Sequence, residues 1–359
     1  MTRYPVTTSH ATSSQTSWPW ESMRAIEAVT AARRIPRRRT WLVSAGLVVA
    51  LVAAFAARVL LGDYTFTPGD AVRIVLGEKL PGADFILLHT KLPRAVLAVL
   101  AGSAFGVAGA IFQGALRNPL ASPDIVGVAM GASAAATFAI IELGQQGVTI
   151  AAWAAGGALA MAAIVRLVGG SGQRLILVGV GATVALQAVV QYLFTRADQY
   201  DAHVALRWLT GSVSYATWPQ ITLVATGLLV LLPLVAALST SLGVVELGPE
   251  LATGLGVGSR RTDLVLVLAV LLVALAVAVA GPIAFVAFLS GPIARGLNGG
   301  RLTLVVAGLV GALLVVAAEY PADYLFADVN YPVGVITGAL GAPCLLWLLA
   351  TGNRVRSSR

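Results

Sequence analysis

Residues 264–294 read LVLVLAVLLVALAVAVAGPIAFVAFLSGPIA, 31 consecutive residues without a charged side chain. A helix needs about 20 apolar residues to cross the hydrocarbon core of a bilayer. The run is too long for one simple helix and short for two full ones. Gly281-Pro282 inside it would break a helix, because proline lacks the amide donor and clashes with the preceding turn. The run therefore predicts a membrane-spanning helix followed by a short returning one.

The composition extends this interpretation to the whole chain. Of the 359 residues, 58% are hydrophobic and 11% are charged, whereas a soluble domain carries roughly 25% charged residues. This balance excludes a water-soluble globule and a disordered chain. Uncharged stretches of spanning length recur along the chain, so we expect an all-α polytopic membrane protein.

Charged residues mark the boundaries of ten predicted spans. They are 41–61, 95–116, 125–141, 143–165, 175–195, about 219–240, two within 264–294, 302–318 and 329–353. Residues 1–40 are rich in Ser, Thr and Pro and end in an arginine cluster, which predicts an extended, disordered tail. Residues 353–359 predict a short basic tail.

Lysine and arginine are divided unevenly between the two sides of these spans. If both termini are cytoplasmic, the cytoplasmic segments carry 17 of the 24 Lys and Arg residues and the outer segments carry 7. This bias fits the positive-inside rule for an even number of spans. The net charge of +8 is thus largely a topology signal, and we expect no nucleic-acid partner.

Residues that carry chemistry are scarce. Cys344 is the single cysteine, so one chain can form neither a disulfide nor a cysteine-based metal site. His10, His89 and His203 lie apart in polar segments, which predicts no metal site. No charged residue falls in the middle of a span, whereas ion-coupled carriers usually keep one there. The phosphate-binding loop G-x-x-x-x-G-K-[ST] is absent, so the chain does not bind ATP in that way.

Four motifs in a fixed order are more specific than hydropathy. They are 91–94 (KLPR) with 117–123 (RNPLASP), Trp208 with Gly211-Ser212, 247–257 (LGPELATGLGV) and 280–286 (AGPIAFV). A final segment, 331–343 (YPVGVITGALGAP), continues the series. Over about residues 41–352 the chain resembles the FecCD-type permease family, the membrane subunits of ABC importers for ferric siderophores, haem and cobalamin.

The resemblance implies the architecture of a type II ABC importer permease, with about ten transmembrane helices, both termini cytoplasmic and 41–352 as the permease domain. It also implies partners: ABC ATPase subunits that bind ATP and Mg, an extracytoplasmic substrate-binding protein, and a second permease copy or paralogue. This chain would be a transport subunit of the cell membrane with no cofactor and no catalytic residue of its own.

Residues 117–123 form a polar connection just inside the membrane. Their two prolines prevent regular helix and leave backbone groups that need partners. From the residues alone this is a helix connection. The resemblance implies that Asn118 and Leu120 line the cytoplasmic gate of the translocation pathway, with Gly172 and Gln173 in the neighbouring gate loop. That loop lacks the small hydroxyl residues of the cobalamin permease.

Residues 247–257 predict a short surface helix, with Gly248 before it, Pro249 at its first position, and Gly254 and Gly256 at its end. A helix of two turns is marginal alone and needs a partner surface. It could lie on the membrane surface, whereas the resemblance implies the coupling helix that enters a groove of the ATPase. The residues assigned to this contact are Leu247, Gly248, Glu250, Leu251, Ala252, Leu255 and Gly256.

Two basic residues, Lys91 and Arg94, precede the second span on the outer face, against the positive-inside trend. The resemblance implies that they pair with acidic residues of the binding protein. Near the outer end of the ninth span, the cobalamin permease has a further docking arginine, whereas this chain has Asp323. Docking is therefore expected to use a different charge pattern or a different part of that loop.

The sequence thus predicts the permease of an ATP-driven importer that moves ferric siderophore into the cytoplasm. Residues 281–285 (GPIAF) are more similar to siderophore members than to cobalamin members. Import of cobalamin or haem is the alternative within the family. An ion-coupled secondary transporter is disfavoured by the missing intramembrane charge, and a membrane-embedded enzyme by the lack of a catalytic set.

Overall fold

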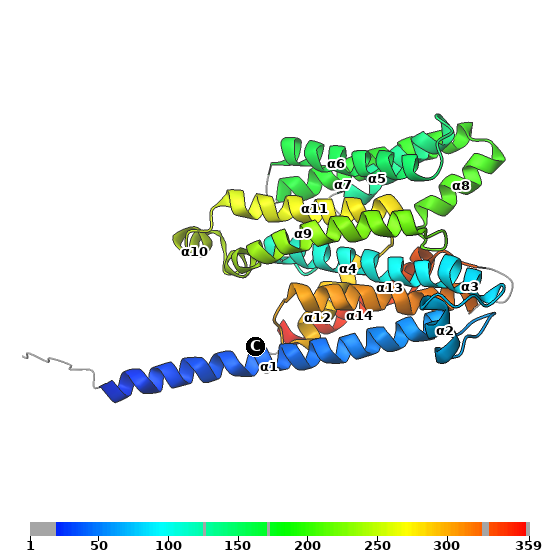
Figure 1. Cartoon of the computed structure of the whole chain (residues 1–359). Coiled ribbons are helices and arrows are strands. Elements are labelled where there is room, and N and C mark those ends of the chain that lie inside the picture. The colour runs from blue at the N-terminus through cyan, green and yellow to red at the C-terminus, as the bar shows by residue number, and fades with distance from the viewer. Residues whose placement is uncertain (1–18, 125–126, 171–172, 325–329, 357–359) are drawn as a thin grey trace, which may run out of the picture. The chain divides into compact units, whose positions relative to one another are not determined.

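The computed structural model describes residues 19–124, 127–170, 173–324 and 330–356 (Figure 1). All secondary structure within these residues is helical. The chain divides into two compact units, residues 1–42 and residues 43–359. The second unit contains all of the helices described below except the first part of α1.

Helix α1 (Pro19–Leu60) begins inside the segment that the sequence predicts to be an extended tail. The difference has a local cause, because a helix satisfies its own backbone hydrogen bonds without a core, and residues 19–40 include several alanines, the best helix former. Residues 1–18 of that predicted tail and residues 357–359 of the C-terminal tail lie outside the described residues.

Ten apolar helices of the described residues correspond to the ten predicted spans. Seven are long enough to cross a membrane. Two of them are Arg38–Leu60, the second part of α1, and Ala83–Ala115, whose last part is α4 (Leu92–Ala115). The other five are α6 (Val148–Gly169), α7 (Gln173–Arg196), α9 (Trp218–Val245), α11 (Ser259–Ala280) and α13 (Leu304–Tyr324). Three are shorter: α5 (Val128–Ile141), α12 (Val286–Leu297) and the apolar part of α14 (Val333–Arg356). The all-helical, ten-span prediction is confirmed.

Short helices at the two ends of the second unit connect these spans. At one end lie α2 (Pro68–Val75), α3 (Ala83–Phe85), η1 (Ile86–Lys91) and α8 (Gln199–Leu209), and at the opposite end lies α10 (Pro249–Gly254) (Figure 1). An even number of spans with cytoplasmic termini makes the α10 end cytoplasmic and the α8 end extracytoplasmic.

Helix α4 is the centre of the second unit and packs against α13, α11, α12 and α9. Of the most apolar 18 residues in the span that ends in α4, 78% are buried, whereas only 17% of the corresponding residues in α7 are buried. Glycines allow the closest approach: a Cβ on Gly102 of α4 would lie 2.5 Å from the carbonyl oxygen of Gly311 in α13. Small residues of this kind let membrane helices pack backbone against backbone.

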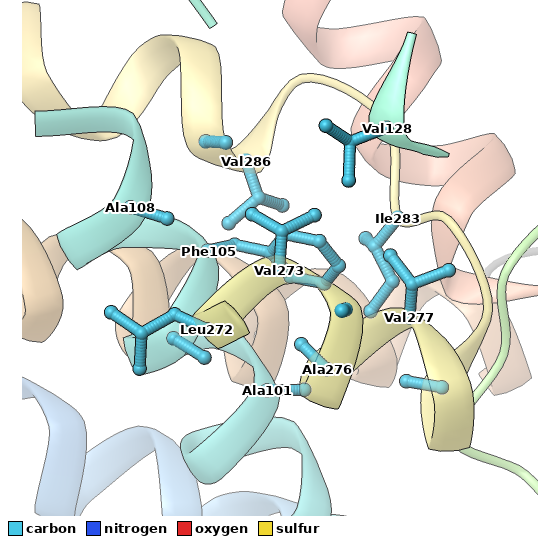
Figure 2. Close-up of a cluster of buried hydrophobic side chains, with 14 of the residues drawn as sticks. Ala101, Phe105, Ala108, Val128, Leu272, Val273, Ala276, Val277, Ile283 and Val286 are labelled. Atoms are coloured by element: carbon cyan, nitrogen blue, oxygen red, sulfur yellow. The ribbon is translucent and has the colours of Figure 1, made fainter. Parts of the chain in front are cut away.

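The break predicted at Gly281-Pro282 is confirmed. Helix α11 ends at Ala280, Gly281 takes a φ of 68°, and α12 begins at Val286. Figure 2 shows Val273 and Val277 of α11 and Val286 of α12 gathered around Phe105 of α4. The Ala280 carbonyl at the break accepts a hydrogen bond of 2.8 Å from the Ser212 amide. The interruption is therefore buried and partnered, as irregular backbone in a membrane must be.

Candidate functional site

The loop that follows α4 contains two of the predicted gate residues. The Asn118 amide donates to the Gln113 carbonyl at 3.1 Å, and its side-chain Oδ1 accepts from the Leu120 amide at 2.9 Å. Asn118 thus closes the turn with its own side chain, while Leu120 is 36% exposed. Arg117, just before the turn, has a φ of 50°. In the structure Asn118 stabilises the turn after α4, and the exposed side chain of Leu120 is available for contact.

Asp124 in the same loop is half-buried. Burial raises the pKa of its carboxyl from 3.8 to about 6. The other two predicted gate residues follow α6. Gly172 lies outside the described residues, and Gln173 is the first residue of α7, whose side chain at that position is not described.

The predicted coupling residues form α10 and its flanks. Leu247 lies before the helix, Leu251 within it and Leu255 directly after it, and these leucines are 58%, 60% and 63% exposed. Ala252, by contrast, is 3% exposed and anchors the segment. A row of exposed leucines at the cytoplasmic end is the feature expected of a protein contact.

The ends of this segment are set by glycine. Gly248, before the helix, has a φ of 114°, and Gly256, after it, has a φ of 80°. Both values lie in the region that only glycine adopts readily. Glu250, in the first turn, is exposed, so it can make polar contacts beside the leucine row.

The gate loop and α10 are neighbours. A cavity of about 310 Å³ is lined by Leu116 and Arg117 from the gate loop and by Ala252 from α10. A Cβ added at Gly248 would lie 3.4 Å from Nη1 of Arg117. The structure therefore brings together two predicted groups that are about 130 residues apart in the sequence, so that a displacement of α10 would reach the gate loop directly.

On the outer face, Lys91 is folded into the chain. Its residue is 5% exposed, and Nζ donates to the carbonyl oxygens of Leu61 at 2.7 Å and Tyr64 at 2.6 Å. Lys91 thus ties the connection after α1 to the start of α4. Its ammonium group is committed to these two carbonyls.

Arg94, one turn further along, is held but accessible. Its Nε donates to the Ser214 carbonyl at 2.8 Å and its Nη1 to Oδ2 of Asp323 at 3.1 Å, and its side chain is 20% exposed. Nη2 makes no hydrogen bond to the described residues. A guanidinium offers five N–H donors, so Arg94 can donate to a further carboxylate from outside the chain.

Sequence reasoning missed a buried ionic cluster behind Arg94. Arg58 of α1, 1% exposed, donates from Nε to Glu319 and from Nη2 to Asp323 of α13, both at 2.6 Å. Asp323 Oδ2 accepts from Arg58 and Arg94 together. The available signal was the pairing of opposite charges at the outer ends of the first and ninth spans. Asp323, where the cobalamin permease has an arginine, is an internal counter-ion.

No group of three or more His, Cys, Asp or Glu residues that could hold a metal occurs within the described part of the chain. The features that carry chemistry are therefore the charged outer face and the cytoplasmic leucine row with its gate loop.

Comparison with known sequences adds three findings. A family model described as the FecCD transport family matches residues 49–351. The chain is 34% identical to the Fe(3+)-citrate import system permease protein YfmE of Bacillus subtilis, over 84% of this chain and 93% of that protein. It is 35% identical to the ferric enterobactin transport system permease protein FepG of Escherichia coli, over 86% of this chain and 95% of that protein.

A solved structure has the same fold. It is described as an inward-facing conformation of a metal-chelate type ABC transporter and aligns with a TM-score of 0.76 and 25% sequence identity. The alignment covers 86% of this chain and 98% of the other.

Proposed function

This chain belongs to the FecCD transport family and is the permease of an ABC importer, and from that premise we propose that its cargo is a ferric siderophore. It is a multi-pass protein of the cytoplasmic membrane. Such permeases have no ATPase site and bind no cofactor, because ATP is bound by a partner ATPase. An extracytoplasmic binding protein is the other partner that the family implies.

The observation that carries the choice of cargo is the agreement among relatives. The relatives from two distant bacteria are named for Fe(3+)-citrate and ferric enterobactin, and each aligns over more than nine-tenths of its length. Both cargoes are ferric chelates. The 281–285 segment, similar to siderophore members, supports the same class.

For energy coupling we assign the leucine row of Leu247, Leu251 and Leu255 to the ATPase, with Glu250 at its rim. The argument rests on the exposure of the row and on the proximity of α10 to the gate loop. A shift of α10 on ATP binding would move Leu120 and so open or close the inner end of the pathway.

On the outer face we assign docking of the binding protein to Arg94, with Lys91 fixing the backbone from which it projects. The unused Nη2 donor of Arg94 supports the first role, and the two carbonyl contacts of Lys91 support the second. Asp323 takes part by orienting Arg94.

A second permease copy, or a close paralogue, completes the pathway in this proposal. Helix α7 presents apolar residues that the chain itself leaves uncovered, including Leu177 at 72% exposed and Val184 at 63%. A partner subunit would cover part of such a surface and lipid would cover the remainder.

The proposal is tested by uptake of radiolabelled iron, supplied as ferric siderophore, in cells with and without this gene. Uptake should be lost on deletion, survive an uncoupler while ATP remains, and stop on ATP depletion. Unchanged uptake on deletion would contradict the siderophore assignment, and cobalamin and haem uptake would then be measured in the same strains.

A further inference from the structure

A second polar feature of the outer face is a cavity of about 470 Å³ between α8, the start of α4 and the start of α14. Its cationic lining residues are Arg94 and Arg207, and its other polar ones include His203, Ser212, Ser214 and Asn330. Among the described residues that line it, none is Asp or Glu. This volume lies within the range of about 300–1,000 Å³ found for small-molecule sites.

The positive lining follows from the way α8 is placed. His203, Arg207 and Thr210 all line the cavity, and their spacing of four and three residues puts them on one face of a helix. The acidic residues of α8 stand at its other end, where Oδ1 of Asp198 accepts from the Asp201 amide at 2.9 Å and caps the helix. The helix thus places the Arg207 guanidinium at the cavity and its capping carboxylate at the opposite end.

These cations are only partly compensated. Arg207 donates from Nη1 to the Tyr215 hydroxyl, and its guanidinium lies 5.5 Å from the centre of the Tyr215 ring. Arg207 forms no ion pair within the described chain. Arg94 shares Oδ2 of Asp323 with Arg58, and this oxygen lies 3.1 Å from Arg94 but 2.6 Å from Arg58.

We propose that this cavity is a binding site for an iron chelate that carries free carboxylates, at the outer mouth of the permease. The proposal rests on the proposed function and narrows the cargo to anionic ferric chelates. Guanidinium groups bind carboxylates through parallel N–H donors, and Arg207 has donors left for this beyond the Nη1 that it gives to the Tyr215 hydroxyl. The hydroxyl groups of Ser212 and Ser214 and the amide of Asn330 supply neutral partners for hydroxyl or carbonyl groups of the chelate.

The site also has a place in transport. A chelate released by the binding protein must be retained long enough to enter the pathway. A cleft lined by one sign of charge raises the local concentration of an oppositely charged ligand. The cavity would therefore favour the transfer of anionic chelates over neutral or cationic ones.

The test measures the charge and occupancy of the cavity by thiol labelling of the assembled transporter in nanodiscs. Leu206, which lines the cavity and is 54% exposed, is replaced (Leu206→Cys) in a Cys344→Ser background. We expect a negatively charged methanethiosulfonate to label it about tenfold faster than a positively charged one, the low end of the rate gain in a charged cleft. Adding Arg207→Gln should remove most of this preference, and ferric citrate should slow labelling severalfold.

A matched control is Gln146→Cys, in the exposed outer loop after α5 and outside the cavity. It should show little charge preference and no protection by ferric citrate. Equal labelling by both reagents at the Leu206→Cys site, or absence of protection, would overturn the proposal. If Arg207→Gln instead weakens capture of the binding protein and leaves ferric citrate protection unchanged, the face is a protein-docking surface and the proposal is also wrong. ATP-driven siderophore uptake is measured separately, so a failure here leaves the proposed function standing.

Discussion

The outer and cytoplasmic ends of this permease are held together in different ways. At the outer end, Arg58 connects α1 to α13 through two carboxylates at 2.6 Å, and all three side chains are at most 6% exposed. At the cytoplasmic end, Glu246 and Arg295 connect α9 to α12 at 2.7 Å with side chains 31% and 29% exposed. The outer ends of the helices are therefore joined by buried ion pairs, whereas the cytoplasmic end has a partly exposed ion pair and an exposed leucine row.

The difference fits the division of labour in an importer. Buried ion pairs cost a great deal to break singly, so the outer ends of α1, α4 and α13 move as one body. Exposed ion pairs are weak, so the gate loop and α10 can shift when a partner binds. The first three predictions below test this contrast, from the largest expected effect to the smallest, and the fourth tests the pH dependence of the gate loop.

Breaking the outer cluster should cost most. Arg58→Ala leaves Glu319 buried without its partner, and the expected loss is about 3–5 kcal/mol of unfolding free energy. Thermal unfolding in detergent measures it. The control is Arg73→Ala, whose contact with Glu78 is 3.7 Å long and exposed and which should cost less than about 1 kcal/mol. Equal losses in the two variants would refute the contrast.

Changing the leucine row should abolish coupling and spare the fold. Leu251→Asp alters a side chain that is 60% exposed, so the melting temperature should change little. ATP-dependent uptake should fall at least tenfold, because a charge in an apolar contact costs about 1.4 kcal/mol or more. Leu76→Asp, at an 81% exposed leucine of the outer face, is the matched control and should transport normally. If both variants transport alike, α10 does not carry the coupling.

Breaking the cytoplasmic ion pair should have a small effect on stability. Glu246→Gln removes the charge that faces Arg295 at a partly exposed site, so the expected loss is at most about 1 kcal/mol. Comparing its melting temperature with that of Arg58→Ala measures the contrast between the two ends directly. A loss as large as that of Arg58→Ala would show that the cytoplasmic end is as rigidly held as the outer one.

The last prediction concerns the pH dependence of stability at Asp124 in the gate loop, whose pKa of about 6 lies above the ordinary 3.8. As pH rises from 3.8 toward 6, the carboxyl loses its proton in the unfolded chain before it does so in the folded one. The raised pKa therefore lowers the free energy of unfolding progressively over this range, and the loss is complete above pH 6. Asp124→Asn should therefore gain in melting temperature relative to the unchanged protein between pH 4.5 and 6.5, and the gain should level off above. A gain that does not depend on pH would contradict this assignment.

The fold could be predicted because the bilayer imposes a simple rule. Ten apolar stretches, and a break at Gly281-Pro282, follow from span length and proline chemistry alone. The start of α1 at Pro19 did not follow, because a polar helix needs no core and leaves no hydrophobic pattern.

The candidate site could be predicted in part. The leucine row of 247–257 was visible as a four-residue repeat, and in the structure all three leucines are exposed. The environment of Lys91 and Arg94 was not visible, because their partners are distant in the sequence: Asp323 lies 229 residues from Arg94. A charge at the end of a span looks the same whether it faces solvent, a partner or a buried counter-ion.

The most direct test of the central claim is transport in proteoliposomes that contain the permease, its ATPase and its binding protein. Radiolabelled ferric siderophore should cross the membrane only when ATP is supplied on the ATPase side, and a proton ionophore should not change the rate. Leu251→Asp should bring the rate down to that measured without ATP. Transport that needs no ATP and follows an imposed proton gradient would contradict the account.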